Sequence, residues 1–155
     1  MIDIDGDKFS KHYPFNDDLT LQILKGHLLA EEILREIFKL SLNQPHALEG
    51  SNGTSFECHQ VICLVEAICP LTPKLGWVWL AAKKLNSLRN KLAHSLEPKG
   101  IEHKVTDLIN YVSSQKYSMV AEAKNSDPEA SELFLVIMAI CAVLSSIKDV
   151  HSAQA

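Results

Sequence analysis

Three side chains that lie close together in the sequence have the types needed for acid–base chemistry on a phosphodiester. The segment Leu-Arg-Asn-Lys-Leu-Ala-His contains Arg89, Asn90 and His94. Histidine titrates near neutral pH and so suits proton transfer. Arginine stays charged, and its planar fork matches two phosphate oxygens. With the neutral donor and acceptor of asparagine, these groups could bind a phosphodiester, move a proton and neutralise charge on a pentacoordinate phosphorus without a metal ion.

The spacing of Arg89 and His94 limits how the two side chains can meet. Residues five positions apart on an ideal α-helix differ by about 140° in direction, so they do not share a face. They converge only if the helix ends or bends near Ala93, or if two subunits of a symmetric dimer bring their segments together. A simpler interpretation is that both are capping cations, because the helix dipole favours positive charge near a C-terminus.

Leucines at helical spacing place this segment near the end of a helix. Leu85, Leu88 and Leu92 follow the i, i+3, i+7 pattern of a buried stripe. The helix is predicted to start near 74–75 and to end around 95–96, because a proline and a glycine follow. It is the third of five predicted helices, and the others cover 17–42, 55–69, 101–123 and 127–150.

These five helices predict an all-α fold. Asp127 caps the last helix, and Pro128 occupies its first turn. Within that helix, 133–144 is apolar all round, so the helix is either the central core helix or part of a subunit interface. The chain has 155 residues, of which 46% are apolar. We therefore predict one domain over 1–155, a compact bundle of about five helices, in which 1–15 is flexible or irregular.

The charge of the chain is unevenly distributed. The net charge is -4 with neutral histidines, yet the window 74–104 contains seven basic and two acidic residues, a net charge of +5. A basic segment in an acidic molecule can attract a polyanion locally, and the ordinary alternative is a solvated helix face. If the polyanion is RNA, Lys83, Lys84 and Lys91 are candidate contacts with it.

Other features argue against several classes of protein. The four cysteines form no Cys-x-x-Cys pair, and no spacing of histidines suggests a metal site. The glycines are too scattered for a phosphate-binding loop. The N-terminus lacks the pattern of a secretory signal, and the apolar run 133–144 is shorter than the ~20 residues that span a bilayer. We therefore expect a soluble, cytoplasmic protein with no metal, no cofactor and no membrane segment.

A further pair of polar residues lies on the first long helix. His27 and Glu31 are four positions apart, so they can meet on one helix face. The pair could support the segment that contains Arg89 and His94, or it could be an ordinary surface pair.

The segment from Leu88 to His94 resembles the signature of HEPN domains, which consists of an arginine, a polar residue, a short spacer and a histidine. Arg89, Asn90 and His94 match the form of this signature with four residues between the arginine and the histidine. The position on the third helix and the all-helical context also match. The long first helix that carries His27 and Glu31 is similar too.

The resemblance implies both a fold and an activity. Many HEPN proteins are metal-independent ribonucleases that act as homodimers, with two motifs lining one cleft, and many are toxins of toxin–antitoxin pairs or parts of defence systems. It therefore implies an RNA substrate, a homodimer and an antitoxin protein as partners. Other members are regulators without shown cleavage. The mannitol-operon repressor family is one such group, and this chain is similar to it in size and helix layout. The sequence does not separate these two alternatives.

Overall fold

The computed structural model describes residues 4–15, 18–49, 55–70 and 73–154, and all the regular elements among them are helical. The predicted all-α bundle is confirmed, with more helices than the five expected. In chain order the elements are α1 (Ile4–His12), α2 (Leu19–Leu40), the 3₁₀ turn η1 (Pro45–Leu48), α3 (Cys58–Ile68), α4 (Trp77–Ala93), α5 (Ile101–Ser113), the 3₁₀ turn η2 (Lys116–Ser118), α6 (Val120–Ser126) and α7 (Glu132–Gln154).

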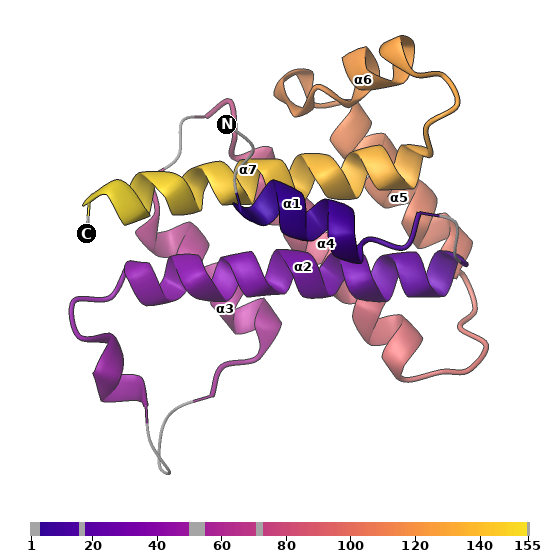
Figure 1. The fold of residues 1–155 in the computed structure, drawn as a ribbon. Coiled ribbons are helices and arrows are strands. Elements are labelled where there is room, and N and C mark those ends of the chain that lie inside the picture. The colour runs from indigo at the N-terminus through magenta and orange to yellow at the C-terminus, as the bar shows by residue number, and fades with distance from the viewer. Residues whose placement is uncertain (1–3, 16–17, 50–54, 71–72, 155) are drawn as a thin grey trace.

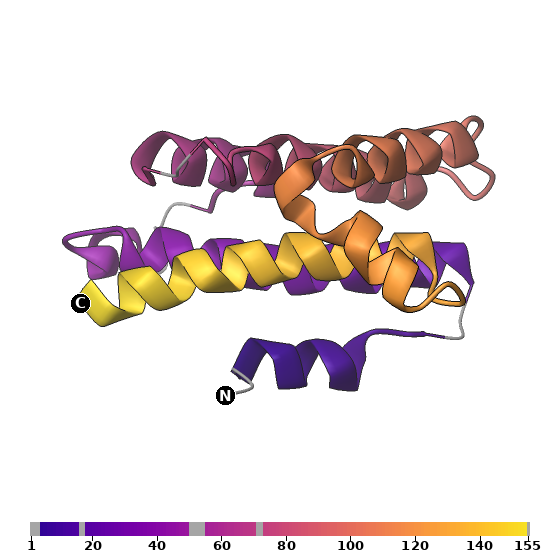
Figure 2. The same ribbon diagram turned by 90° about the horizontal axis from the view of Figure 1, so that it is seen from above.

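The helices are arranged in three layers. The long helices α2 and α7 lie side by side in the middle layer and run in the same direction (Figure 1). Figure 2 shows α1 alone on one side of this layer and α3, α4 and α5 on the other side. The short helix α6 leads the chain back from the outer layer to α7. Both faces of the middle layer are therefore packed against other helices.

Helix α7 is the central core helix, the first of the two alternatives expected for it. Val136, Ile137, Ile140 and Leu144 are fully buried, at 0% exposure. The helix has 23 residues and is long and apolar enough, by length and composition, to cross a membrane. The sequence estimate considered only the shorter run 133–144. Of the most apolar 18-residue window of this helix, 56% is buried inside the bundle, as is typical of the core helix of a helical domain.

The close contact between α2 and α7 depends on a glycine. A Cβ atom built on Gly26 would lie 2.8 Å from Cδ1 and 2.9 Å from Cγ2 of Ile137, which is fully buried. Atoms packed in a core cannot move far from such a contact, because protein interiors are already close-packed. The absence of a side chain at this position therefore allows the two long helices to approach each other.

We expect Gly26→Ala to lower the free energy of unfolding by about 1–3 kcal/mol, the usual cost of overpacking a core. This loss outweighs the ~1 kcal/mol that alanine gains over glycine in a helix. Urea denaturation measures the change. Ile137→Val removes the nearer of the two clashing atoms, so the double variant should lose less than the sum of the single variants. Gly76→Ala is the matched control, because its Cβ meets only Pro73 O at 3.7 Å; an equal loss there would contradict the argument.

The N-terminal segment differs from the expectation of a flexible or irregular 1–15. Helix α1 covers Ile4–His12, and Phe9 and Tyr13 are buried at 7% and 3% exposure. The two rings stack with their centroids 5.0 Å apart, and each lies against Phe134 of α7. A spacing of four residues puts Phe9 and Tyr13 on one face of a helical turn. This pair anchors α1 to the middle layer.

Three predicted helices are confirmed to within a few residues at their ends, namely those over 17–42, 55–69 and 74–75 to 95–96. Their ends follow local caps. The carboxylate of Asp18 accepts a hydrogen bond from the backbone N–H of Leu21 at 2.8 Å, which starts α2. At the start of α3, Gln60 Oε1 accepts a hydrogen bond from the backbone N–H of Glu57 at 2.9 Å, so the helix begins at Cys58, later than the predicted start at 55.

The predicted helix over 101–123 is broken in the structure. Helix α5 stops at Ser113, where Ser114 Oγ and Gln115 Nε2 both donate hydrogen bonds to the carbonyl of Tyr111. These side chains occupy the Tyr111 carbonyl, which would otherwise accept the next backbone hydrogen bond of the helix. Met119 then adopts a left-handed conformation, with φ 62°, before α6 begins.

The start of the last helix was also predicted too early. Residues 127–130 form a turn, and α7 begins at Glu132. The ammonium group of Lys124 donates hydrogen bonds to the carbonyls of Pro128 and Ala130, both at 2.7 Å. This bridge holds the segment as a turn, so Asp127 does not cap α7 and Pro128 is not in its first turn.

Candidate functional site

A pocket of about 340 Å³ lies between α2, α3 and α4, and Arg89, Asn90 and His94 of the predicted motif all line it. Helix α4 ends at Ala93, and His94 is its C-cap residue, whose backbone N–H donates to the carbonyl of Asn90 at 3.2 Å. His94 therefore lies where the helix ends, and it lines the same pocket as Arg89 within one chain. The lining residues are Glu31, Arg35, Glu57, Cys58, His59, Asn86, Arg89, Asn90 and His94.

The apolar face of α4 determines which of its residues reach this pocket. Val78, Ala81, Leu85 and Leu88 are buried at 0–1% exposure, so the helix cannot rotate about its axis without losing these contacts. Arg89 is then exposed on the side that faces α3, and its Nη1 donates a hydrogen bond to Asn90 Oδ1 at 3.0 Å. The predicted motif thus presents an arginine, an amide and an imidazole to one solvent-accessible pocket.

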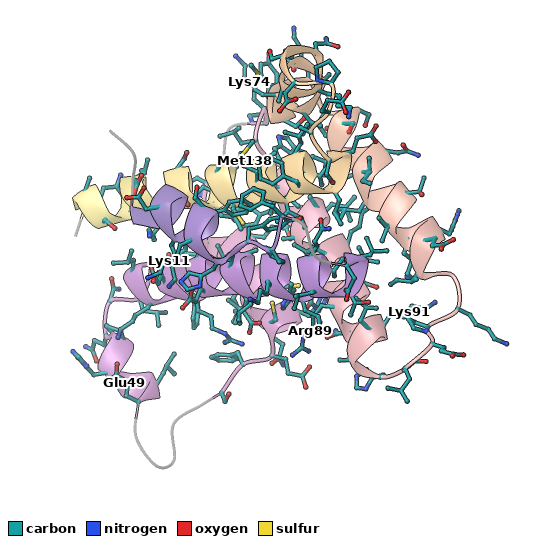
Figure 3. All side chains as sticks on the ribbon, turned by 45° about the vertical axis from the view of Figure 1, so that its right-hand side comes forward. Lys11, Glu49, Lys74, Arg89, Lys91 and Met138 are labelled. Atoms are coloured by element: carbon teal, nitrogen blue, oxygen red, sulfur yellow. The ribbon has the colours of Figure 1, made fainter. Side chains whose placement is uncertain are left out.

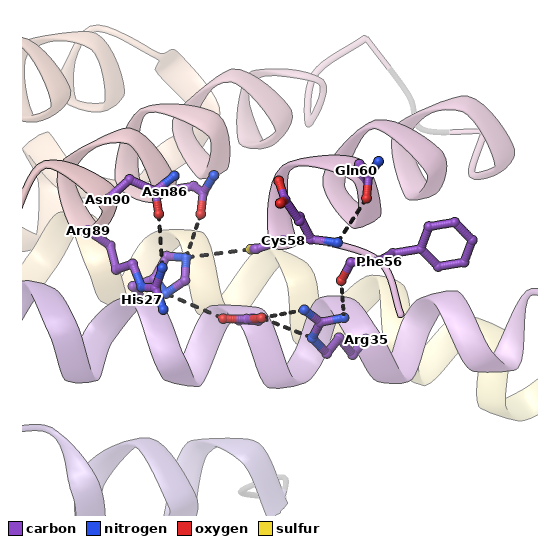
Figure 4. A network of polar contacts seen from close by, with 10 residues as sticks. His27, Arg35, Phe56, Cys58, Gln60, Asn86, Arg89 and Asn90 are labelled. Atoms are coloured by element: carbon purple, nitrogen blue, oxygen red, sulfur yellow. Dashed lines mark hydrogen bonds and ion pairs between the residues drawn. The ribbon is translucent and has the colours of Figure 1, made fainter. Parts of the chain in front are cut away.

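The wall opposite the motif is an ion pair on α2 that the sequence analysis did not identify. Oε1 of Glu31 accepts hydrogen bonds from Nη2 of Arg35 at 2.6 Å and from its Nε at 2.9 Å (Figure 4). Nη1 of Arg35 donates to the carbonyl of Phe56 at 3.1 Å. Arg35 therefore ties the segment before α3 to α2 and shapes the pocket. The i, i+4 spacing of Glu31 and Arg35 was the available signal.

His27 lies beneath the pocket as a buried group, so the alternative of an ordinary surface pair with Glu31 is wrong. The ring is 3% exposed. Its Nε2 is 3.0 Å from Asn86 Oδ1 and 3.5 Å from Cys58 Sγ, and its Nδ1 is 3.6 Å from Glu31 Oε2 (Figure 4). Burial lowers the pKa of His27, and the contacts with Asn86 and Glu31 offset only part of this effect. The imidazole is therefore neutral at neutral pH.

Cys58 is the residue through which α3 joins this cluster. Burial, and secondly the negative charge of Glu31, raise the pKa of the Cys58 thiol to about 11. At neutral pH the sulfur is therefore a protonated thiol next to the His27 ring. This environment therefore disfavours a thiolate nucleophile at Cys58.

The structure also brings together a set of metal-ligating atoms, where sequence spacing suggested none. One ligand atom each from His27, Glu31 and Cys58 lies within 4.8 Å of the other two. The three residues come from positions 27, 31 and 58, on two helices that are separated by a long connection. Sequence spacing alone could not predict this convergence, because the packing of α3 against α2 produces it.

The three lysines that were candidates for RNA contact do not line the pocket. Lys83 pairs with Glu66, and Nζ of Lys84 lies 2.5 Å from Oδ2 of Asp107. The ammonium of Lys91 lies beside Gly100 in the connection to α5, and Figure 3 shows Lys91 and Arg89 on different sides of α4. Two of the seven basic residues of 74–104 are therefore matched by acidic neighbours, and none of these three lysines lies at the pocket.

Comparison with known proteins identifies no relative of this chain. No protein-family model matches the chain, and neither the curated proteins nor the solved structures contain a match to it. The chemistry of the pocket is therefore the basis for inferring a function. Its groups can bind an anion through Arg89, move a proton through His94 and offer amide contacts through Asn86 and Asn90.

Proposed function

We propose that the protein is a metal-independent endoribonuclease of the HEPN type, and that Arg89, Asn90 and His94 form its active site. The observation that carries the proposal is the convergence of these three side chains on one solvent-accessible pocket in a single chain. A guanidinium, an amide and an imidazole at one pocket supply anion binding and proton transfer, the two functions that RNA cleavage by internal attack needs.

In the proposed reaction the 2′-hydroxyl of a ribose attacks the adjacent phosphorus. His94 takes the proton from this hydroxyl as the bond between the 2′-oxygen and phosphorus forms. The bond between phosphorus and the 5′-oxygen then breaks, and His94 returns the proton to that oxygen. Arg89 stabilises the negative charge on the pentacoordinate phosphorus, assisted by Asn90. The products are a 2′,3′-cyclic phosphate and a free 5′-hydroxyl.

The size of the pocket bears on the substrate that we propose. A pocket of about 340 Å³ is at the small end of the roughly 300–1,000 Å³ usual for ligand pockets. It has room for the scissile phosphate and its immediate neighbours, while the rest of an RNA strand would run over the surface. We propose a homodimer, in which two such pockets can act on one strand. A toxin of this kind would also have an antitoxin protein as a partner.

Cleavage of RNA by the purified dimer in excess EDTA tests the proposal. We expect RNA to be cut and DNA of the same sequence to stay intact, because DNA lacks the 2′-hydroxyl nucleophile. Fragments should end in a 2′,3′-cyclic phosphate, which mass spectrometry identifies. Activity should elute at about twice the chain mass of 17.2 kDa. No turnover on a broad panel of RNAs, with partner binding that survives His94→Ala, would instead support a non-catalytic regulator, similar to the mannitol repressors.

A further inference from the structure

We propose that His27, Cys58 and Glu31 form a binding site for a transition-metal dication, Zn²⁺, at the base of the pocket. The ligand atoms of the three side chains lie within 4.8 Å of one another, and they are the one such group among the residues that the structure describes. The site is separate from the proposed reaction, which uses no metal, and the test of the site does not need RNA.

The distance between the nitrogen and sulfur atoms fits a tetrahedral ion. Zinc binds histidine nitrogen at about 2.0–2.1 Å and cysteine sulfur at about 2.3 Å, so a tetrahedral angle separates the two ligand atoms by about 3.6 Å. Nε2 of His27 and Sγ of Cys58 are 3.5 Å apart. An ion can therefore bind both atoms after only a small side-chain adjustment.

The carboxylate of Glu31 is placed to complete the set of protein ligands. Its Oε1 is held by Arg35. Its Oε2 lies 3.6 Å from Nδ1 of His27, and a carboxylate oxygen of Glu31 lies within 4.8 Å of the ligand atoms of both His27 and Cys58. Hydrogen bonds that orient a ligand in this way are usual around protein metal sites. Binding of the ion at Nε2 replaces the contact of this nitrogen with Asn86 Oδ1, which lies 3.0 Å away.

The surroundings of the three ligands allow an ion to enter. Glu31 and Cys58 line the pocket, and the side chain of Glu31 is 18% exposed, whereas His27 is buried beneath them. Three protein ligands leave one tetrahedral position open toward the pocket, where a water molecule can bind. A mixed set of nitrogen, sulfur and oxygen donors selects Zn²⁺ over Ca²⁺ or Mg²⁺, which prefer oxygen ligands.

Binding of the ion changes the chemistry of the pocket. As the bond between zinc and sulfur forms, the Cys58 thiol releases its proton to solvent. The ion adds positive charge near Arg89 and competes with Arg35 for the carboxylate of Glu31. We therefore expect Zn²⁺ to inhibit the enzyme, a consequence that rests on the proposed ribonuclease function, whereas the binding itself does not.

Titration of the reduced, full-length protein with Co²⁺ in place of Zn²⁺ tests the site. A cobalt ion bound to a thiolate gives an intense charge-transfer band in the near ultraviolet. We expect one ion per chain, displaced by Zn²⁺, and loss of the band in Cys58→Ser and in His27→Gln. Glu31→Gln should keep the band and weaken binding by roughly 10-fold or more. Circular dichroism of each variant shows that the fold is retained.

A second cysteine–histidine pair provides the matched control. Cys63 Sγ lies 3.6 Å from Nε2 of His59 on the same helix, but this pair has no third ligand in the described part of the chain. Cys63→Ser should therefore leave the band unchanged. The proposal is wrong if Co²⁺ and Zn²⁺ do not bind, if Cys58→Ser keeps the band, or if Cys63→Ser abolishes it. Failure of RNA cleavage with intact metal binding would reject only the proposed function.

Discussion

His94→Ala should reduce the rate of RNA cleavage by roughly 10²-fold or more, the usual contribution of a general acid or base. His94 is the exposed C-cap residue of α4 and lines the same pocket as Arg89. Alanine cannot accept the proton of the 2′-hydroxyl, and no other histidine of the pocket lies within the motif. Initial rates on a defined RNA, with excess EDTA present, measure the effect.

Arg89→Lys should recover little of the activity that Arg89→Ala loses. A lysine keeps the positive charge, but a point charge cannot replace the two parallel hydrogen bonds of the guanidinium to a phosphate. Lys91→Ala is the matched control, because Lys91 lies inside the same motif and does not line the pocket. It should retain nearly full activity. Equal losses in the Lys91 and His94 variants would show that the motif does not act through this pocket.

The same variants should leave the fold nearly unchanged. Arg89 and His94 are both exposed, and exposed substitutions usually change the free energy of unfolding by no more than about 0.5 kcal/mol. Circular dichroism and the thermal midpoint check this. If either substitution unfolds the protein, the two cations serve mainly to cap α4, and the argument for an active site loses its support.

Tyr13→Ala should lower the free energy of unfolding by about 3–5 kcal/mol, the range for removing a large buried aromatic side chain. Tyr13 is 3% exposed, and its ring contacts those of Phe9, Phe15 and Phe134, with centroids 5.0, 5.3 and 5.6 Å away. Its removal leaves a cavity between α1 and α7. For a domain of this size the thermal midpoint should fall by on the order of 10 °C.

Two further variants separate the contributions at this position. Tyr13→Phe removes only the hydroxyl, which donates to Oε1 of Gln22 at 3.0 Å, and should cost about 0.5–1.5 kcal/mol. Phe15→Ala is the matched control, because Phe15 belongs to the same cluster but is 49% exposed. If Tyr13→Ala costs no more than Phe15→Ala, helix α1 does not pack against α7 as described.

The sequence by itself determined the helical class and the position of the motif. Leucines at helical spacing predicted the helix that became α4, because apolar residues that recur with the period of a helix form one face that packs into the core. The proline and glycine after it predicted that the helix would end around 95–96, and it ends at Ala93. His94 and Arg89 line one pocket within a single chain, which is one of the alternatives that the sequence left open.

Local hydrogen bonds outside the apolar pattern decided where the expected helices break. Ser114 and Gln115 cap the carbonyl of Tyr111, and Lys124 holds the turn before α7. Each residue is an unremarkable polar one in sequence. The effect of each residue depends on which backbone carbonyl its side chain reaches, and the spacing of apolar residues does not predict that contact.

Tertiary structure alone decided the surroundings of the motif. Glu31 and Arg35 come from α2, Cys58 from the start of α3 and Asn86 from α4. Nothing in the spacing of these residues relates one helix to another, because side-chain periodicity specifies which face of a helix is buried and leaves its partner undefined. The packing of α3 and α4 against α2 brought the buried His27 within reach of Cys58 and Asn86. Contacts between helices therefore placed the Glu31–Arg35 pair opposite the motif and produced the metal-ligating set.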